Sequence, residues 1–397
     1  MKRKCLLLML SGILFFLLLI LGFHLAQRKP IWNDEIMTQT HSIDRLSYGQ
    51  ILRGLTRVEG NNHPLFYLIQ KIISDLNHYR FPKAWEGEYL YAEPRSQLTM
   101  RIGSNIFMSL SLVILFYFFS LRYSLGVGLY ALLIALLAPM TWIYWVEARP
   151  YSLWFLLSVL QSLLLVQLFA KVRAEAMIFT GLSVIHVLLA VTTMASALQI
   201  IIASFVVWFL FKDKPWRVYG GLTVLPLALC VFYYIQSTKF LLAMPSAWGK
   251  LIYPHLSQDQ MTFLSVYVTF LLCHNLKNRR SWSSFFYEDK QWEAKTYLMF
   301  VLLMLAGTMG YFIAQGSVPI PNPHNMIKDK YFLYLTPVVI VATILFSIDL
   351  VKNCRNDPWM SVNIILGLMG FVVIRFLRAY LEISHANLIL NYLGEYW

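Results

Sequence analysis

Charged residues are scarce in this chain, and cysteines are scarcer still. Asp, Glu, Lys and Arg make up only 13% of the 397 residues, whereas 58% are hydrophobic, and the mean hydropathy is +0.58. One soluble core cannot bury so much apolar surface, so these values exclude a soluble globular protein and indicate a polytopic membrane protein. The four cysteines, Cys5, Cys230, Cys273 and Cys354, fall in or beside apolar runs. This placement implies no disulfide or metal framework.

Acidic residues are the rarer of the two charge signs, because 20 Asp and Glu stand against 33 Lys and Arg, for a net charge of +13. A nucleic-acid-binding protein gathers such an excess into one stripe or patch. Here the basic residues are dispersed among apolar runs, so we expect membrane lipids as partners and no nucleic acid. The sequence contains no evident cluster of metal ligands, so we expect no cofactor, although a divalent cation stays compatible with it.

Long apolar runs dominate what is present. Lys2, Arg3 and Lys4 precede the run 5–23, which has no small-residue cleavage site before Gln27 and therefore predicts an uncleaved first transmembrane helix, residues 1–26. Further runs approach the roughly 17 to 25 residues that a span needs; they are residues 102–121, 125–145, 153–170, 177–191, 198–211, 218–235, 261–274, 297–314, 331–350 and 360–377. We expect an all-α polytopic membrane protein with about eleven transmembrane helices.

The positions of the basic residues predict the orientation. Arg122, Lys212 and Lys352 are among those that fall in alternate short loops, as the positive-inside rule requires of cytoplasmic loops. The N-terminus is then cytoplasmic, and residues 27–101 form a long first extracytoplasmic loop that carries interfacial helices. Residues 102–377 form the helix bundle, and residues 378–397 form a tail on the outer surface.

Two adjacent carboxylates, Asp34 and Glu35, come shortly after the first run. An extended chain covers at most about 3.6 Å per residue, so the short link keeps both at the membrane boundary. One interpretation is an exposed helix start, with Asn33 or Asp34 as N-cap and Glu35 in the first turn. The other is a catalytic carboxylate at the interface, with Glu35 as its helper.

The same loop contains Asn61-Asn62-His63-Pro64-Leu65-Phe66-Tyr67. Proline is favoured at the first helical position, so we predict a helix that begins at Pro64 and whose apolar side chains suit the membrane interface. His63 lies at its start. It is either a substrate-binding residue or a polar cap for backbone N–H groups.

A third candidate is the turn Glu147-Ala148-Arg149-Pro150-Tyr151-Ser152 between two predicted spans. Aromatic residues flank it: Trp142, Tyr144, Trp145 and Trp154. Belt aromatics place such a turn at headgroup depth, where the planar guanidinium of Arg149 suits a phosphate. The alternative is a structural pair between Glu147 and Arg149.

A fourth candidate is residues 319–331, which lead into a late span. Its polar and aromatic residues include His324, Lys328, Lys330 and Tyr331. Cations here again lie at an outer helix entrance, where orientation does not require them. The alternative is a solvated basic loop.

These four segments, in this order, resemble the motifs of the polytopic GT-C glycosyltransferases, and most of all the bacterial protein-mannosyltransferase-like and aminoarabinose-transferase-like branch. The resemblance spans most of the chain. It departs at His63-Pro64-Leu65, where His-Pro-Pro is usual, and at Lys330, where Arg is common. It implies the GT-C fold, a location in the plasma (bacterial inner) membrane, and sugar transfer from a polyprenyl-phosphate donor to an extracytoplasmic acceptor.

By the same resemblance, Asp34 is the catalytic carboxylate, assisted by Glu35. The candidates for binding the donor phosphate are Arg149, Lys328, Lys330 and Tyr331, and those for other substrate contacts are His63, Glu147, Tyr151 and His324. Inverting transfer needs such a base and such cations. Two other functions stay open: a transporter or flippase of a lipid-linked glycan, which would bind near the midplane, and a non-catalytic membrane scaffold.

Overall fold

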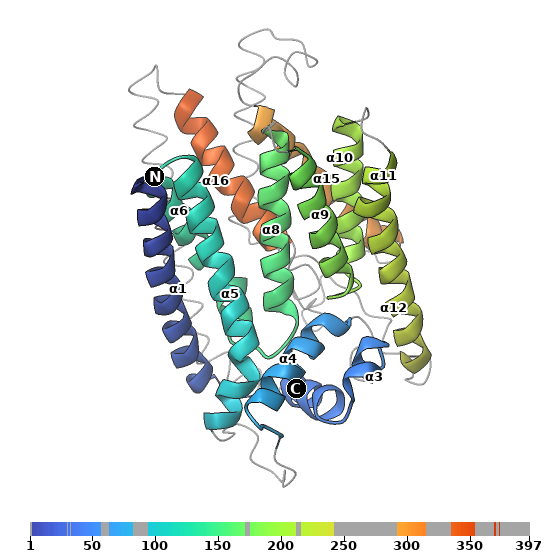
Figure 1. Cartoon of the computed structure of the whole chain (residues 1–397). Coiled ribbons are helices and arrows are strands. Elements are labelled where there is room, and N and C mark those ends of the chain that lie inside the picture. The colour runs from blue at the N-terminus through green and yellow to red at the C-terminus, as the bar shows by residue number, and fades with distance from the viewer. Residues whose placement is uncertain are drawn as a thin grey trace.

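The computed structural model describes residues 2–29, 31, 33–56, 63–81, 94–170, 175–211, 216–241, 292–314, 335–353, 369, 370 and 373. Within these residues every regular element is a helix (Figure 1). The predicted all-helical architecture is therefore confirmed for the described part of the chain. The runs 261–274 and, apart from residues 369, 370 and 373, 360–377 lie outside it.

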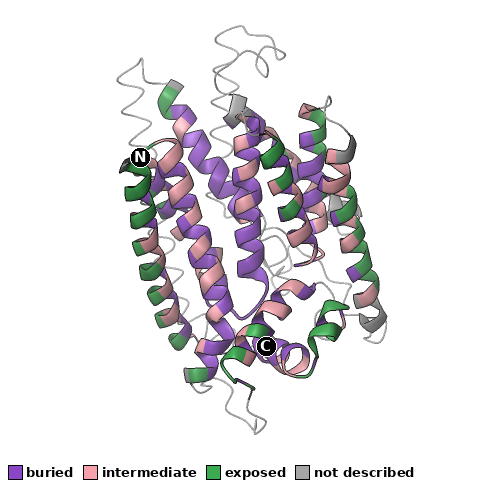
Figure 2. Cartoon of the chain, in the orientation of Figure 1, coloured by how far each residue is buried: buried purple, intermediate pink, exposed green. Residues whose placement is uncertain are grey.

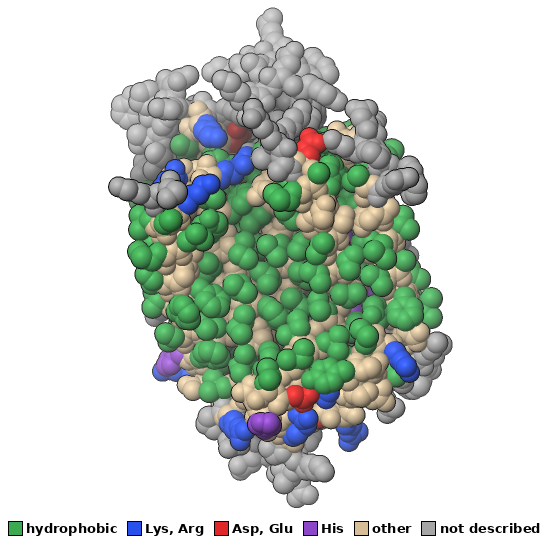
Figure 3. All heavy atoms as spheres, viewed as in Figure 1, with side chains coloured by type: hydrophobic (Ala, Val, Ile, Leu, Met, Phe, Trp, Pro, Cys, Tyr) green, Lys and Arg blue, Asp and Glu red, His purple; other side chains and the backbone are tan. Residues whose placement is uncertain are grey.

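Four of the described helices are long and apolar enough to cross a membrane. They are α1 (Lys2–Arg28), α5 (Pro94–Arg122), α8 (Tyr151–Phe169) and α16 (Leu335–Asn353). An apolar run in lipid becomes a helix because a helix satisfies its own backbone hydrogen bonds. Hydrophobic side chains cover the middle of the face in Figure 3, and charged side chains gather towards its two ends. These features support a helical membrane protein.

Shorter helices complete the described bundle. They are α6 (Leu125–Leu136), α7 (Pro139–Trp145), α9 (Glu175–Ala190), α10 (Ser196–Leu210), α11 (Trp216–Tyr219), the π-helix η3 (Gly220–Val224), α12 (Leu225–Leu241) and α15 (Trp292–Ala314). Most coincide with a predicted apolar run to within a few residues. The pattern of apolar runs therefore located the helices well, although it did not fix where each one begins.

Two predicted spans differ from the helices that form. The run 125–145 divides into α6 and α7 because Pro139 lacks the N–H that a continuous helix needs and disfavours helical geometry before it. The run 102–121 belongs to a longer helix, since α5 begins at Pro94. Its first turns lie in the segment predicted as loop, and the charge of Arg101 is accommodated there by an ion pair described below.

Helices α5 and α8 form the centre of the bundle. α5 contacts α1, α6 and α8, and α8 also contacts α9, α15 and α16. Figure 2 shows α8 buried along most of its length, whereas α1 has an exposed outer face. That face carries Leu6, Phe16 and Ile20, which are more than half exposed, as expected of a helix that faces lipid.

The first loop folds into short helices at one end of the bundle, which we call the loop end (Figure 1). They are α2 (Asn33–Met37), the π-helix η1 (Thr38–Ile43), α3 (Tyr48–Leu52) and α4 (Pro64–Leu76). The predicted helix start at Pro64 is confirmed. Phe66 and Tyr67 of α4 are buried, while Ile72 and Leu76 are exposed, so α4 is amphipathic.

The close approach of α1 and α5 depends on Gly22. A Cβ atom there would lie 1.9 Å from Asn105 Oδ1 and 2.6 Å from Trp145 Nε1. Asn105 cannot move aside freely, because its Nδ2 donates to the carbonyl of Leu19 at 3.0 Å and its Oδ1 accepts from Trp145 Nε1 at 2.8 Å. The interface therefore requires glycine at this position.

We expect Gly22→Ala to destabilise the protein by about 1–3 kcal/mol, the usual cost of overpacking. The matched control is Gly12→Ala in the same helix, where the new Cβ meets no atom within 4 Å. That substitution should stabilise the helix by up to about 1 kcal/mol. Unfolding in mixed detergent measures both, and equal shifts for the two variants would contradict the prediction.

Candidate functional site

Glu35 forms a buried two-point ion pair with Arg101 of α5. Arg101 Nε donates to Glu35 Oε1 at 2.9 Å, and Nη2 donates to Oε2 at 2.7 Å. Both side chains have 0% exposure. Arg101 Nη1 also donates to the carbonyls of Ala26 at 2.7 Å and Lys29 at 2.6 Å. The first turn of α2 is therefore fastened both to α5 and to the end of α1.

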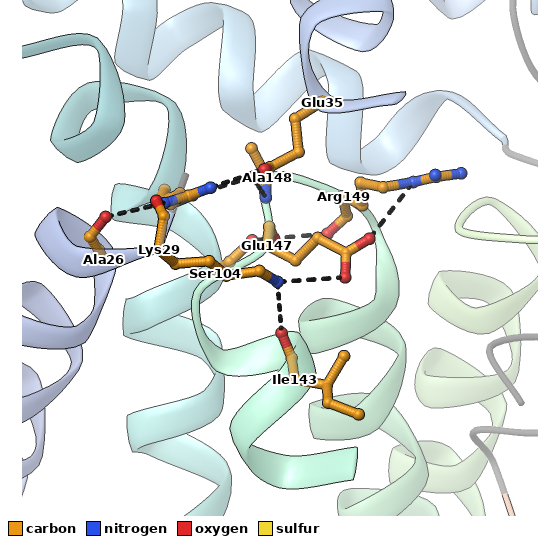
Figure 4. Close-up of polar contacts among 9 residues, drawn as sticks. Ala26, Lys29, Glu35, Ser104, Ile143, Glu147, Ala148 and Arg149 are labelled. Atoms are coloured by element: carbon orange, nitrogen blue, oxygen red, sulfur yellow. Dashed lines mark hydrogen bonds and ion pairs between the residues drawn. The ribbon is translucent and has the colours of Figure 1, made fainter. Parts of the chain in front are cut away.

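A second contact joins Glu35 to the turn between α7 and α8. The backbone N–H of Ala148 donates to Glu35 Oε1 at 2.7 Å. Figure 4 shows the side chains of Glu35 and Glu147 on opposite sides of Ala148. We call Glu35, Arg101 and the Ala148 N–H the carboxylate clamp. It holds together three segments that are far apart in the sequence.

Glu35 is held ionised by this environment. Burial alone would raise the pKa of its carboxyl, but the charge and hydrogen bonds of Arg101, the charge of Lys29 and the Ala148 N–H together bring the pKa below its ordinary value. Both oxygens are engaged, so this carboxylate is poorly placed to take a proton from a substrate. The sequence allowed Asp34 and Glu35 to lie at an exposed helix start. The helix does begin at Asn33, but Glu35 in its first turn is buried.

Asp34 immediately precedes Glu35 in α2. Its side chain lies outside the described residues, so its catalytic role stays a prediction. Its backbone is nevertheless placed, because neighbouring Cα atoms are about 3.8 Å apart and the clamp fixes Glu35. The sequence neighbour on the other side of Glu35, Ile36, is also buried, with 2% exposure.

The turn that carries Arg149 is packed tightly against α5. The backbone N–H of Arg149 donates to the carbonyl of Glu147 at 2.8 Å, and the hydroxyl of Ser104 donates to the same carbonyl at 2.5 Å. Pro150 follows and opens α8. This local structure arises because proline cannot continue the preceding backbone pattern and is tolerated at a helix start.

The side chain of Arg149 is 1% exposed. Its Nε lies 3.9 Å from Glu147 Oε1, which is within ion-pair range but too long for a hydrogen bond. Its guanidinium carbon lies 5.0 Å from the ring centroid of Tyr151, and that ring lies 4.8 Å from the ring of Tyr144. The predicted Glu147, Arg149 and Tyr151 are therefore brought together, and the pair that was the alternative interpretation is present as a long contact.

Lys29 is a member of this cluster that the sequence interpretation missed. Its Nζ lies 3.8 Å from Glu147 Oε2 and donates to the carbonyl of Ile143 at 3.3 Å. Lys29 and Arg149 approach the carboxylate of Glu147 from different sides (Figure 4). A lysine just past an apolar run usually marks the cytoplasmic end of a span. Lys29 instead follows the predicted outer end of the first span, and this placement was the only signal of another role.

His63 is placed at a different point of the loop end. It is 1% exposed, its Nδ1–H donates to the carbonyl of Ala190, and its backbone N–H donates to Thr192 at 3.1 Å. Its ring lies 5.3 Å from that of Tyr233. Burial lowers the pKa of His63 to about 4, so the imidazole is neutral at physiological pH. These contacts fasten α4 to α9 and α12.

Four predicted site residues lie outside the described part of the chain: His324, Lys328, Lys330 and Tyr331. Whether their cations meet Arg149 stays a prediction. Among the described residues, no three His, Cys, Asp or Glu side chains form a group suited to a metal ion.

The cluster combines three cations, Lys29, Arg101 and Arg149, with two buried carboxylates at the loop end. In a site of low polarity such charges act strongly on an anionic group that enters. With Lys29 protonated, the five side chains carry one net positive charge beside the start of α2. The sequence matches no model of a known protein family and no curated protein at a significant level.

Proposed function

We propose that this protein is an integral membrane glycosyltransferase of the GT-C type. It moves a sugar from a polyprenyl-phosphate donor to an extracytoplasmic acceptor with inversion, and Asp34 is the general base. The observation that supports this most is the carboxylate clamp, because it joins the helix that bears Asp34 to the turn that bears Arg149. Glu35 then acts as a positioning residue rather than as a second catalytic carboxylate.

The clamp keeps the backbones of the two proposed reacting groups near each other. Asp34 directly precedes Glu35, and Arg149 directly follows Ala148, whose N–H lies 2.7 Å from the Glu35 carboxylate. One hydrogen bond and one residue on each side therefore separate them along this path. The clamp thus brings together α2, α5 and the turn between α7 and α8, which are far apart in the sequence.

Inverting sugar transfer requires a base beside the acceptor and cations beside the donor phosphate. The oxygen of an acceptor hydroxyl attacks the anomeric carbon, its proton passes to Asp34, and the bond from the anomeric carbon to the phosphate oxygen breaks with its electrons. The phosphate leaves with one more negative charge, which nearby cations stabilise. A hydroxyl is far less acidic than a carboxyl, so proton transfer is late and a well-placed base contributes about 10²- to 10⁴-fold.

The end of the bundle away from the site supports the proposed orientation. Arg3 donates to the carbonyls of Ser120 at 2.9 Å and Tyr123 at 3.3 Å. Arg122 and Lys352 lie 5.7 Å and 5.3 Å from the ring centroid of Tyr123. Cations from three helices gather there, as the positive-inside rule expects of a cytoplasmic end. The site is then on the outer side, and a bundle of about eleven spans with the GT-C arrangement is part of the proposal.

Transport of a lipid-linked glycan is a weaker explanation of the described residues. Polar side chains at the centre of the apolar helices bond to one another: Gln161 Nε2 donates to His186 Nε2 at 2.8 Å, Gln199 Nε2 donates to Gln161 Oε1 at 2.6 Å, and Trp154 Nε1 donates to Gln199 Oε1 at 3.1 Å. Groups satisfied in this way act as structural links. A scaffold, in turn, would not need buried cations around one turn.

A reconstituted transfer assay tests the function. The purified chain is placed in liposomes with a synthetic polyprenyl-phosphate sugar and a mixture of envelope lipids and glycans as acceptors. We expect a new glycosidic product and release of polyprenyl phosphate. Movement of the headgroup across the bilayer without a new glycosidic bond would favour the transporter. If neither transfer nor transport is observed, the result would favour the scaffold.

A further inference from the structure

We propose that Lys29 is a positioning residue for Arg149, acting through Glu147, and so sets the affinity of this site for a lipid-linked phosphate. This inference rests on the proposed function, whose donor carries that phosphate. It gives a role to a half-buried cation, with 18% of its side chain exposed, that orientation does not explain. It also identifies one residue that contacts both halves of the site.

The backbone and the side chain of Lys29 have separate partners. Its N–H continues the helical pattern of α1 by donating to Leu25 at 3.1 Å, and its carbonyl accepts from Arg101 at 2.6 Å. Its Nζ contacts Glu147 at 3.8 Å. The carbonyl thus supports the carboxylate clamp, and the ammonium reaches the turn that carries Arg149. Both positions follow from the end of α1.

Glu147 is shared between two cations. Lys29 Nζ lies 3.8 Å from Oε2, and Arg149 Nε lies 3.9 Å from Oε1. Glu147 is 4% exposed and Arg149 is 1% exposed, so water screens these charges little. Because Lys29 offsets part of the charge of Glu147, Arg149 is bound less strongly by that carboxylate and is more available to a phosphate. Without Lys29, Glu147 would compete with the phosphate for Arg149.

The charge of Lys29 also gives the site a pH dependence. Burial lowers the pKa of Lys29 below its ordinary value, although Glu147 and Glu35 partly oppose this and the cations Arg101 and Arg149 add to it. The protonated form is the one that offsets Glu147. Phosphate affinity should therefore fall as the pH rises through that pKa, at a lower pH than for an ordinary lysine. An arginine at position 29 stays charged throughout.

Direct binding of farnesyl phosphate to the full chain in nanodiscs tests the inference between pH 7 and 10. We expect Lys29→Met to bind about ten-fold more weakly or worse at pH 7, and Lys29→Arg to bind as the natural chain does at pH 7 while losing its alkaline decline. Lys71→Met is the matched control, because Lys71 is a lysine of the same loop whose ammonium likewise donates to a backbone carbonyl, that of Ile43 at 2.9 Å. It should bind normally.

Unchanged binding by Lys29→Met, an alkaline decline that persists in Lys29→Arg, or a natural chain that does not bind the probe would each overturn the inference. If Lys29→Met fails to fold, as judged by gel filtration and circular dichroism, the pH profile of Lys29→Arg decides alone. Probe binding that depends on Lys29 without any sugar transfer would refute only the proposed function. Transfer with no dependence on Lys29 would refute only this inference.

Discussion

Replacing Asp34 with Asn is expected to lower kcat for sugar transfer by about 10²- to 10⁴-fold, the usual contribution of a positioned general base. Asparagine has nearly the same shape but cannot accept the proton of the acceptor hydroxyl. The affinity for the donor should change little, because the cations of the site remain. Single-turnover transfer from a synthetic polyprenyl-phosphate sugar, with donor binding measured separately, distinguishes the two effects.

The control for this variant is Asp75→Asn in the same loop. Asp75 accepts a hydrogen bond from Tyr48 at 2.6 Å and pairs with Arg80 at 2.6 Å near the surface. Its loss removes a carboxylate of the loop without touching the clamp, so turnover should stay close to that of the natural chain. Stability should also change little, because exposed ion pairs contribute little to it. Near-normal turnover of Asp34→Asn would remove Asp34 from the mechanism.

Breaking the carboxylate clamp should have the largest effect on stability. Arg101→Met leaves the charge of Glu35 buried without its two-point partner, and Glu35→Gln does the reverse. Removal of one member of a buried ion pair typically costs about 3–5 kcal/mol. We expect each variant to unfold at clearly lower denaturant or temperature in detergent than the natural chain.

The double variant Glu35→Met with Arg101→Met separates stability from function. An apolar pair can replace a buried ion pair with little loss of stability, so much of the stability should return. Sugar transfer should not return, because the Ala148 N–H loses its acceptor and α2 is no longer held to the turn of Arg149. A folded double variant with normal transfer would show that the clamp does not position the site.

The pH dependence of the clamp has a defined sign. The pKa of Glu35 is lowered in the folded state by Arg101 and its other partners despite burial. The stability it provides is therefore fully present above the unfolded value of about 4.3 and is lost as the pH falls through the lower folded value. The stability difference between the natural chain and Glu35→Gln should be large at neutral pH and should shrink in acid.

Local patterns in the sequence were enough to locate most helices. Pro64 started α4 as its position predicted, and the apolar runs became α1, α8 and α16. Pro139 was overlooked because a run of high hydropathy does not register a missing N–H, so one predicted span became α6 and α7. Arg101 was taken as the end of a loop because hydropathy treats every charge as solvated.

The sequence by itself determined that the chain is a helical membrane protein, and it directed attention to Asp34, Glu35 and the turn at Arg149. Only the tertiary structure decided what Glu35 does, since its partners are 66 and 113 residues away in the chain. The physical reason is that hydropathy and helix signals act between near neighbours, whereas a buried charge is stable only where distant segments bring the opposite charge to it. For the same reason, Lys29 looked like the flank of a span until its contact with Glu147 was placed.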